Sequence, residues 1–383
     1  MTLQRWSGLC ITVALAAAIL AGAAGAQAKV DVAAHGRRHR VGFGDNAVTV
    51  LYLRGTPYEI GYAHGALCRK EVRYLACEVV PRMMKAVGCT PQHADSVWAG
   101  YSKRLRPEFR EELRGLAAGS GVRLTDIVRA HAVPDMPEWH CTFFAANKLA
   151  TRDGQIIQVR ALDYETGAGI QRYPAMIVCK PSTGVPFVNV GWLGSCGLVT
   201  GMNAEGIAMS QIGDDWDKAT DSLDGRPLNY VMRETIQYAR DLDEAVHIVK
   251  QYPRTTSLLY CLSSAKDNDT RALATSHTQC RVFQAFNLPH WTQTGLVYMS
   301  MRINSNWNQK VGDWLLAEFG TIDPAAARRM MRELRTGSLH AVVFRPGTLD
   351  LWVANASDTA MAYDRPFHAF SLKAALEDPF FAR

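Results

Sequence analysis

The chain of 383 residues lacks several patterns that define common functional classes. Its nine cysteines form no CxxC pair and lie at no zinc-binding spacing from histidine, so we expect no metal site. Basic and aromatic residues are not interleaved as they are at a nucleic-acid surface. The glycine-rich stretch 191–201 lacks the lysine of a phosphate-binding loop, and internal repeats are absent. We therefore expect no cofactor and no nucleic-acid partner.

Long apolar runs are also missing, except at the N-terminus. The stretch 9–26 is apolar, mostly alanine and glycine, and close to the lower length limit for crossing a bilayer. Arg5 precedes it, and Ala26-Gln27-Ala28 has the small-x-small pattern of a signal-peptidase site. This pattern predicts a signal peptide over 1–28 and a secreted or periplasmic protein without stable membrane association. A membrane anchor is the alternative interpretation.

The remaining composition is that of a globular protein, 48% hydrophobic and 20% charged. Lys and Arg outnumber Asp and Glu by 42 to 36, and one dense basic run lies at 35–40. We expect this run to be a solvated, mobile N-terminus. Removal of the signal peptide leaves eight cysteines, and pairing of Cys261 with Cys280, or of Cys68 with Cys77 or Cys89, stays open.

The hydrophobic pattern divides the mature chain at residue 141. Residues 29–140 are typical of helices after one short strand at 48–53. From residue 141 onward, strands and turns dominate, beginning with a hairpin around Asp153-Gly154 and interrupted by a central pair of helices. The order of elements predicts an α+β protein in which two sheets pack together with helices on the outside.

Cys141 opens the first strand of this second part, and Arg160 and Asp163 lie on the next strand. Cleavage of the bond before Cys141 would place an α-amine, with a pKa near 8, on the same residue as the thiol. One residue would then supply both nucleophile and base. Arg160 would favour the thiolate, and Asp163 would orient the ammonium group. Because residues three apart on a strand face opposite sides, we predict an irregularity near residues 161–162.

Five stretches of the chain resemble the penicillin acyltransferase family of self-cleaving N-terminal nucleophile hydrolases, relatives of the choloylglycine hydrolases. They are GTPYEIGYAHG (55–65), ELRGLAAGSGV (112–122), CTFFAANKLATRDGQIIQVRALDY (141–164), GMNAEGIA (201–208) and HAVVFRPGTLDLWVA (340–354). The resemblance implies a four-layer αββα sandwich, self-cleavage before Cys141, and acyl transfer from a small-molecule amide or thioester. Segment 29–140 would be the first, non-covalently held subunit, and 141–383 the catalytic one.

The resemblance also implies roles for individual residues. It makes Cys141 the nucleophile and Arg160 and Asp163 its support. Relatives carry a downstream asparagine as oxyanion donor, and we assign this role to Asn304, with Asn306 as the alternative. The relatives' second asparagine falls on Gly213, where a main-chain N–H would have to serve.

Three other interpretations remain open from the sequence. Arg160 and Asp163 would form a structural ion pair if Cys141 were only a buried apolar residue. Cys196 in GSCG and His340, 144 residues later, have the spacing of a papain-like cysteine protease. The third interpretation is a non-catalytic binding module, in which the chain keeps the sandwich fold but has no enzymatic activity.

Overall fold

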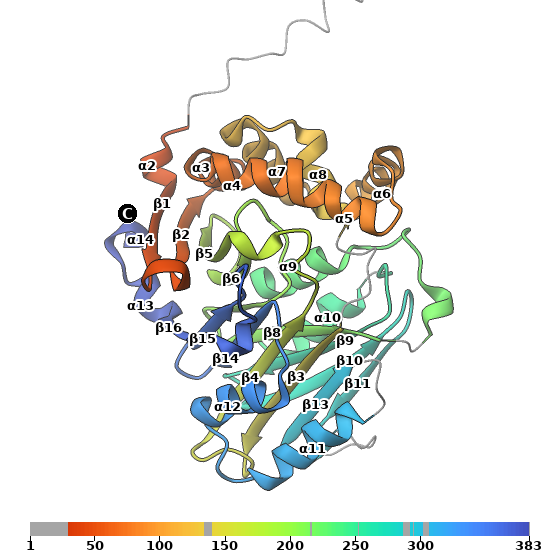
Figure 1. The fold of residues 1–383 in the computed structure, drawn as a ribbon, viewed down its shortest axis with the longest axis vertical. Helices are drawn as coiled ribbons and strands as arrows, with labels where there is room; N and C mark the ends of the chain where they lie inside the picture. The colour runs from red at the N-terminus through yellow and green to blue at the C-terminus, as the bar shows by residue number, and fades with distance from the viewer. Residues whose placement is uncertain are drawn as a thin grey trace, which may run out of the picture.

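The computed structural model describes residues 30–133, 140–214, 217–251, 253–285, 292–293, 295–301 and 306–382. It is a mixed α/β structure with two large sheets (Figure 1). The predicted signal peptide and Asn304 lie outside the described residues. Within the described part, no helix is long and apolar enough to cross a membrane.

The larger sheet has nine strands in the order β1-β2-β5-β6-β7-β8-β9-β10-β11. Their bounds are β1 Gly36–Val41, β2 Val48–Gly55, β5 Pro174–Pro181, β6 Phe187–Trp192, β7 Gly201–Asn203, β8 Ile207–Gly213, β9 Leu258–Ser264, β10 Asp269–Thr275 and β11 Cys280–Gln284. Neighbouring strands are antiparallel except β2 and β5, which are parallel. The first two strands therefore join the N-terminal segment to the rest of the protein.

The second sheet has seven strands in the order β12-β13-β3-β4-β14-β15-β16. Their bounds are β3 His140–Lys148, β4 Gly154–Asp163, β12 Thr292–Gln293, β13 Leu296–Met301, β14 His340–Arg345, β15 Asp350–Asn355 and β16 His368–Ser371. The predicted hairpin is confirmed, because β3 and β4 pair on either side of Asp153-Gly154 and Gly154 adopts a positive φ of 75°.

The helices lie around these sheets (Figure 1). Those of the N-terminal segment are α2 Val32–His35, α3 Pro57–Leu67, α4 Arg69–Tyr74, α5 Val80–Ala86, α6 Pro91–Arg104, α7 Pro107–Ser120 and α8 Leu124–Ala132, with a π-helical turn at Leu75–Val79. Those that follow are α9 Leu228–Tyr238, α10 Leu242–Lys250, α11 Trp307–Ala317, α12 Pro324–Leu334, α13 Leu372–Leu376 and α14 Pro379–Ala382. Helices α9 and α10 contact the nine-stranded sheet, whereas α11 and α12 contact the seven-stranded one.

Two glycines explain why α3 and α7 pack so closely. A Cβ atom on Gly61 would lie 1.9 Å from the main-chain oxygen of Glu112, and one on Gly115 would lie 2.2 Å from that of Tyr58. Such distances leave no room for any side chain, so these glycines allow direct backbone contact between the helices. The glycines in two of the matched sequence stretches therefore have a packing role.

The N-terminal segment differs from the prediction in one respect. The basic run at 35–40 is not a mobile tail, because residues 36–41 form strand β1 and pair with β2 in full register. Arg38 explains part of this order, since its guanidinium donates to the Glu71 carboxylate at 2.7 Å and to the main-chain oxygen of Leu67 at 3.1 Å. Contacts made only in the folded chain thus order a segment that is polar in sequence.

Candidate active site

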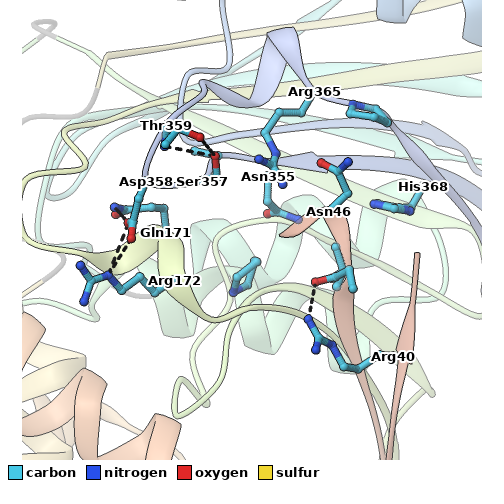
Figure 2. A pocket seen from close by; sticks show the side chains of 15 residues that line it. Arg40, Asn46, Gln171, Arg172, Asn355, Ser357, Asp358, Thr359, Arg365 and His368 are labelled. Carbon is cyan, nitrogen blue, oxygen red and sulfur yellow. Dashed lines mark hydrogen bonds and ion pairs between the residues drawn. The ribbon is translucent and has the colours of Figure 1, made fainter. Parts of the chain in front are cut away.

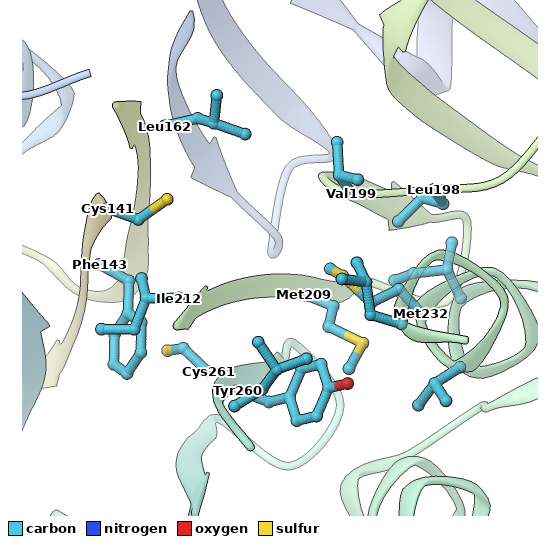
Figure 3. Close-up of a cluster of buried hydrophobic side chains, with 14 of the residues drawn as sticks. Cys141, Phe143, Leu162, Leu198, Val199, Met209, Ile212, Met232, Tyr260 and Cys261 are labelled. Atoms are coloured by element: carbon cyan, nitrogen blue, oxygen red, sulfur yellow. The ribbon is translucent and has the colours of Figure 1, made fainter. Parts of the chain in front are cut away.

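Cys141 lies at the start of β3, the third strand across the seven-stranded sheet. It is paired with Leu162 of β4 on one side and with Met301 of β13 on the other. Directly opposed residues of an antiparallel pair point to the same face of the sheet, so Cys141 shares a face with Leu162. Because side chains alternate along a strand, Gln158 of β4 also lies on this face. The Gln158 amide donates to the hydroxyl of Ser210 of β8 at 2.8 Å, so this face lies against the other sheet. The Cys141 thiol therefore points between the two sheets, where it belongs to the same buried apolar cluster as Met209 and Ile212 (Figure 3).

Arg160 lies on the same face of β4 as Leu162 and is also completely buried. Its Nη1 atom donates to the main-chain oxygen of Ala161 at 2.9 Å. Within the described part of the chain, its Nε and Nη2 atoms have no hydrogen-bond partner. Burying a cation with unsatisfied donors lowers the stability of the folded protein, so we expect Arg160 to have a functional role.

Burial and Arg160 act on the Cys141 thiol in opposite directions. Burial raises the pKa of the thiol, because the low-dielectric interior disfavours the thiolate. The positive charge and hydrogen bonding of Arg160 lower this pKa. The negative charge of Asp163 raises it, and a hydrogen bond from the Asp163 main chain lowers it by less. Burial is the larger effect, so in the uncleaved chain Cys141 is a neutral thiol with a charged group ready to stabilise its ionised form.

The carboxylate of Asp163 points to the opposite face of β4. Its Oδ2 atom accepts a hydrogen bond from the Thr336 hydroxyl at 2.7 Å, and its Oδ1 atom accepts from the main-chain N–H groups of Gly337 at 2.9 Å and Ser338 at 2.8 Å. The Thr142 hydroxyl lies 2.8 Å from that of Thr336. The loop 336–338 after α12 therefore holds the carboxylate beside the first two residues of β3.

This arrangement corrects two sequence-based interpretations. The predicted irregularity at 161–162 is absent, because pairing of β3 with β4 is regular from residue 163 back to 157 and the register shifts only between Ala146 and Lys148. Arg160 and Asp163 also form no ion pair, since their side chains leave β4 on opposite faces. Arg160 approaches Cys141 with its side chain, whereas Asp163 does so with its main chain.

The predicted oxyanion donor, Asn304, cannot be placed because it lies outside the described residues. The strand that precedes it, β13, ends at Met301, the direct pairing partner of Cys141. Asn306, the alternative donor, is exposed at the start of α11. Gly213 ends β8 and is paired with Leu258.

The alternative pair of Cys196 and His340 is not formed. The Nε2 atom of His340 is hydrogen-bonded to the Thr200 hydroxyl at 2.8 Å, and its ring stacks on Trp192 with 5.7 Å between the ring centroids. No described residue is hydrogen-bonded to the Nδ1 atom of His340. Burial raises the pKa of the Cys196 thiol well above its ordinary value. This geometry does not support a papain-like protease.

The loop that contains Cys196 is held by two histidines of the N-terminal segment. The Nε2 atom of His64 accepts from the main-chain N–H of Gly194, and that of His131 accepts from the N–H of Cys196, each at 2.9 Å. Burial lowers the pKa of His64 to about 3 and that of His131 to about 4. Both rings are therefore neutral acceptors that hold the loop in place.

The sequence analysis missed the contribution of residues 336–338. Their only signal in the sequence is a Thr-Gly-Ser loop after a helix, a pattern common to many turns. The described cysteines are all free thiols, and the described residues contain no cluster of three or more His, Cys, Asp or Glu side chains able to hold a metal ion.

Comparisons with known proteins give distant matches, and no family model matches the chain. The chain is 25% identical over 354 residues to protein dcd1A of Dictyostelium discoideum, a match that spans 82% of this chain and 80% of that protein. It is 23% identical over 173 residues to N-acylethanolamine-hydrolyzing acid amidase of Rattus norvegicus, across 43% and 46% of the two chains. Among solved structures, the Caenorhabditis elegans ortholog of that amidase matches at 15% identity and a TM-score of 0.43, over 60% of this chain and 100% of that one.

Proposed function

We propose that the protein is an exported amide hydrolase or acyltransferase with an N-terminal cysteine nucleophile, produced by self-cleavage before Cys141. The observation that carries this proposal is the buried guanidinium of Arg160 beside the Cys141 thiol, with two of its donor atoms unpartnered among the described residues. A structural cysteine needs no such neighbour. A thiol that becomes a thiolate does, because the cation compensates for the cost of burying the negative charge.

Self-cleavage uses only the chain and water. The Cys141 sulfur attacks the carbonyl carbon of residue 140, the bond from that carbon to the Cys141 nitrogen breaks, and the nitrogen takes up the thiol proton. Water then hydrolyses the thioester, which leaves a carboxylate on residue 140 and restores the thiol. The products are segment 29–140 and a chain 141–383 that begins with a free α-amine.

In the cleaved protein, the α-amine accepts the thiol proton while the sulfur attacks the carbonyl of the substrate. The amine later returns the proton to the leaving group, and water or an acceptor amine releases the acyl group from the thioester. Arg160 stabilises the thiolate, and Asp163 keeps the start of β3 in place through Thr336. We assign stabilisation of the oxyanion to Asn304.

The two products would remain together as non-covalent subunits. Strand β2 is paired with β5 from Thr49 to Gly55, and His64 and His131 hold residues 194 and 196. We further propose that the two sheets and their outer helices form the four-layer αββα sandwich of the penicillin acyltransferase relatives. Similarity to an acid amidase supports an amide as the bond that is attacked.

Intact-mass analysis of the purified mature protein tests the processing step. The wild type should give two chains that separate between residues 140 and 141, whereas Cys141→Ala should remain one chain. Cys196→Ala, which removes another buried thiol, should be processed normally. Splitting of Cys141→Ala at the same bond would disprove self-cleavage.

Labelling with a thiol-reactive acyl probe tests the catalytic step. The processed wild type should be labelled saturably at Cys141, and a library of acyl amides should reveal turnover that Cys141→Ser loses. Complete absence of labelling in a processed protein would instead favour the non-catalytic binding module.

A further inference from the structure

A polar cavity of about 350 Å³ lies where β15 ends, at Asn355 (Figure 2). Its walls come from both sides of the proposed cleavage point. Arg40 and Asn46 belong to the N-terminal segment, whereas Arg172, Asn355 and Arg365 follow residue 141. The volume suits a small molecule.

The charged side chains that line this cavity are predominantly cationic. The lining contains three guanidinium groups, those of Arg40, Arg172 and Arg365, and a single carboxylate, that of Asp358. Asp358 is already engaged, because it lies 3.2 Å from the Nε atom of Arg172 and accepts a hydrogen bond of 2.7 Å from Gln171. Within the described part of the chain, Arg40 has no carboxylate partner and donates only to the main-chain oxygen of Ala47, at 3.4 Å.

Two buried polar side chains line the cavity, which distinguishes it from a shallow depression of the surface. Arg365 and Asn355 are each only 8% exposed, and both extend into the same space in Figure 2. The Nδ2 atom of Asn355 has no hydrogen-bond partner among the described residues. Because a buried donor without a partner is unfavourable, a ligand that accepts a hydrogen bond from it would recover that loss.

The cavity is separate from the thiol. Cys141, Leu162, His340 and Asn355 stand in one row across β3, β4, β14 and β15. Three strand spacings of about 4.8 Å place Asn355 about 14 Å from Cys141. Leu162 and His340, both completely buried, occupy the row between them. A molecule in the cavity is therefore not the acyl group that the thiol would attack.

We propose that this cavity binds a small oxyanion ligand, a carboxylate or a phosphate, held by Arg40 and Arg365 and by the amide of Asn355. Guanidinium groups bind both kinds of oxyanion through paired N–H donors. Because Arg40 belongs to one proposed subunit and Arg365 to the other, the ligand would also bridge the two. This site does not depend on the chemistry of Cys141.

Calorimetric titration of the full mature chain at constant ionic strength tests the proposal, with inorganic phosphate and succinate as separate probes. At least one anion should bind saturably with a Kd below about 1 mM. Arg40→Gln should weaken this binding roughly tenfold, as expected for loss of one charge-assisted contact. Comparison of the two probes shows whether phosphate or carboxylate is preferred.

Arg114→Gln is the matched control, because Arg114 is exposed on α7 and paired with Glu111 outside the cavity. It should leave anion binding unchanged. Arg365→Gln should weaken anion binding as Arg40→Gln does. The deciding variant is Arg40→Gln, because Arg40 is exposed and its substitution does not disturb the protein interior. Failure of both anions to bind saturably, or equal binding by Arg40→Gln and the wild type, would overturn the proposal.

Discussion

Asp163 and Thr336 are hydrogen-bonded across 173 residues of sequence, with 2.7 Å between the carboxylate Oδ2 atom and the threonine hydroxyl. This contact joins the end of β4 to the loop after α12. The same hydroxyl lies 2.8 Å from that of Thr142, so one side chain connects the carboxylate to the residue after the proposed nucleophile. The start of β3 is therefore positioned by a distant loop as well as by its neighbouring strands.

Thr336→Val should remove this connection with little change in shape. Loss of a buried hydrogen bond to a charged group should lower the free energy of unfolding by about 1.5–3 kcal/mol. Processing before Cys141 should slow as well, since Asp163 loses a partner. Urea unfolding and the rate of fragment formation measure the two effects. Thr348→Val, at an exposed Thr–Asp pair, is the control and should have little effect on either quantity. An unchanged processing rate in Thr336→Val would show that the contact is only structural.

Arg160→Met should raise the pKa of the Cys141 thiol in the processed protein, because Arg160 is the neighbour whose charge lowers it. A rise of about one pKa unit would reduce the thiolate fraction at neutral pH roughly tenfold. The pH dependence of thiol alkylation measures this change, and Arg160→Lys should retain part of the effect. An alkylation profile identical to that of the wild type would contradict the assigned role of Arg160.

Stability should fall as the pH drops below about 6.5, the ordinary pKa of histidine. The pKa is about 3 for His64 and about 4 for His131 in the folded protein, so between pH 6.5 and pH 5 the unfolded chain binds more protons than the folded one. Each histidine should then cost about 2 kcal/mol by pH 5. Urea unfolding at pH 7 and pH 5 measures the loss. The double variant His64→Gln and His131→Gln should show a shallower dependence, and a slope equal to that of the wild type would argue against this cause.

Gly61→Ala should destabilise the protein by about 1–3 kcal/mol or more, because the added Cβ atom would have to push α3 away from the backbone of α7. Gly100→Ala is the matched control. It lies in α6, and the nearest atom to its added Cβ is 4.0 Å away, so the change should stabilise the helix by about 0.5–1 kcal/mol. Thermal unfolding of the two variants distinguishes them. Equal effects in both would mean that the close helix contact is not needed.

The sequence was most informative where structure is local. The hairpin around Asp153-Gly154 was predicted correctly, because a turn that needs a positive φ is encoded by the residues that form it. The change from helices to strands at residue 141 was likewise readable from the hydrophobic pattern. The basic run at 35–40 was misjudged, because its strand depends on pairing with β2 and on the contact of Arg38 with Glu71.

By itself, the sequence determined the turns, the type of most elements and the placement of a cysteine, an arginine and an aspartate on one hairpin. Strand alternation already required Arg160 and Asp163 to face opposite sides. Only the tertiary structure decided what lies on each side: the interior between the sheets with Cys141 for Arg160, and the loop 336–338 for Asp163. The physical reason is that backbone geometry sets the direction of a side chain locally, whereas its partners come from segments that only folding brings together.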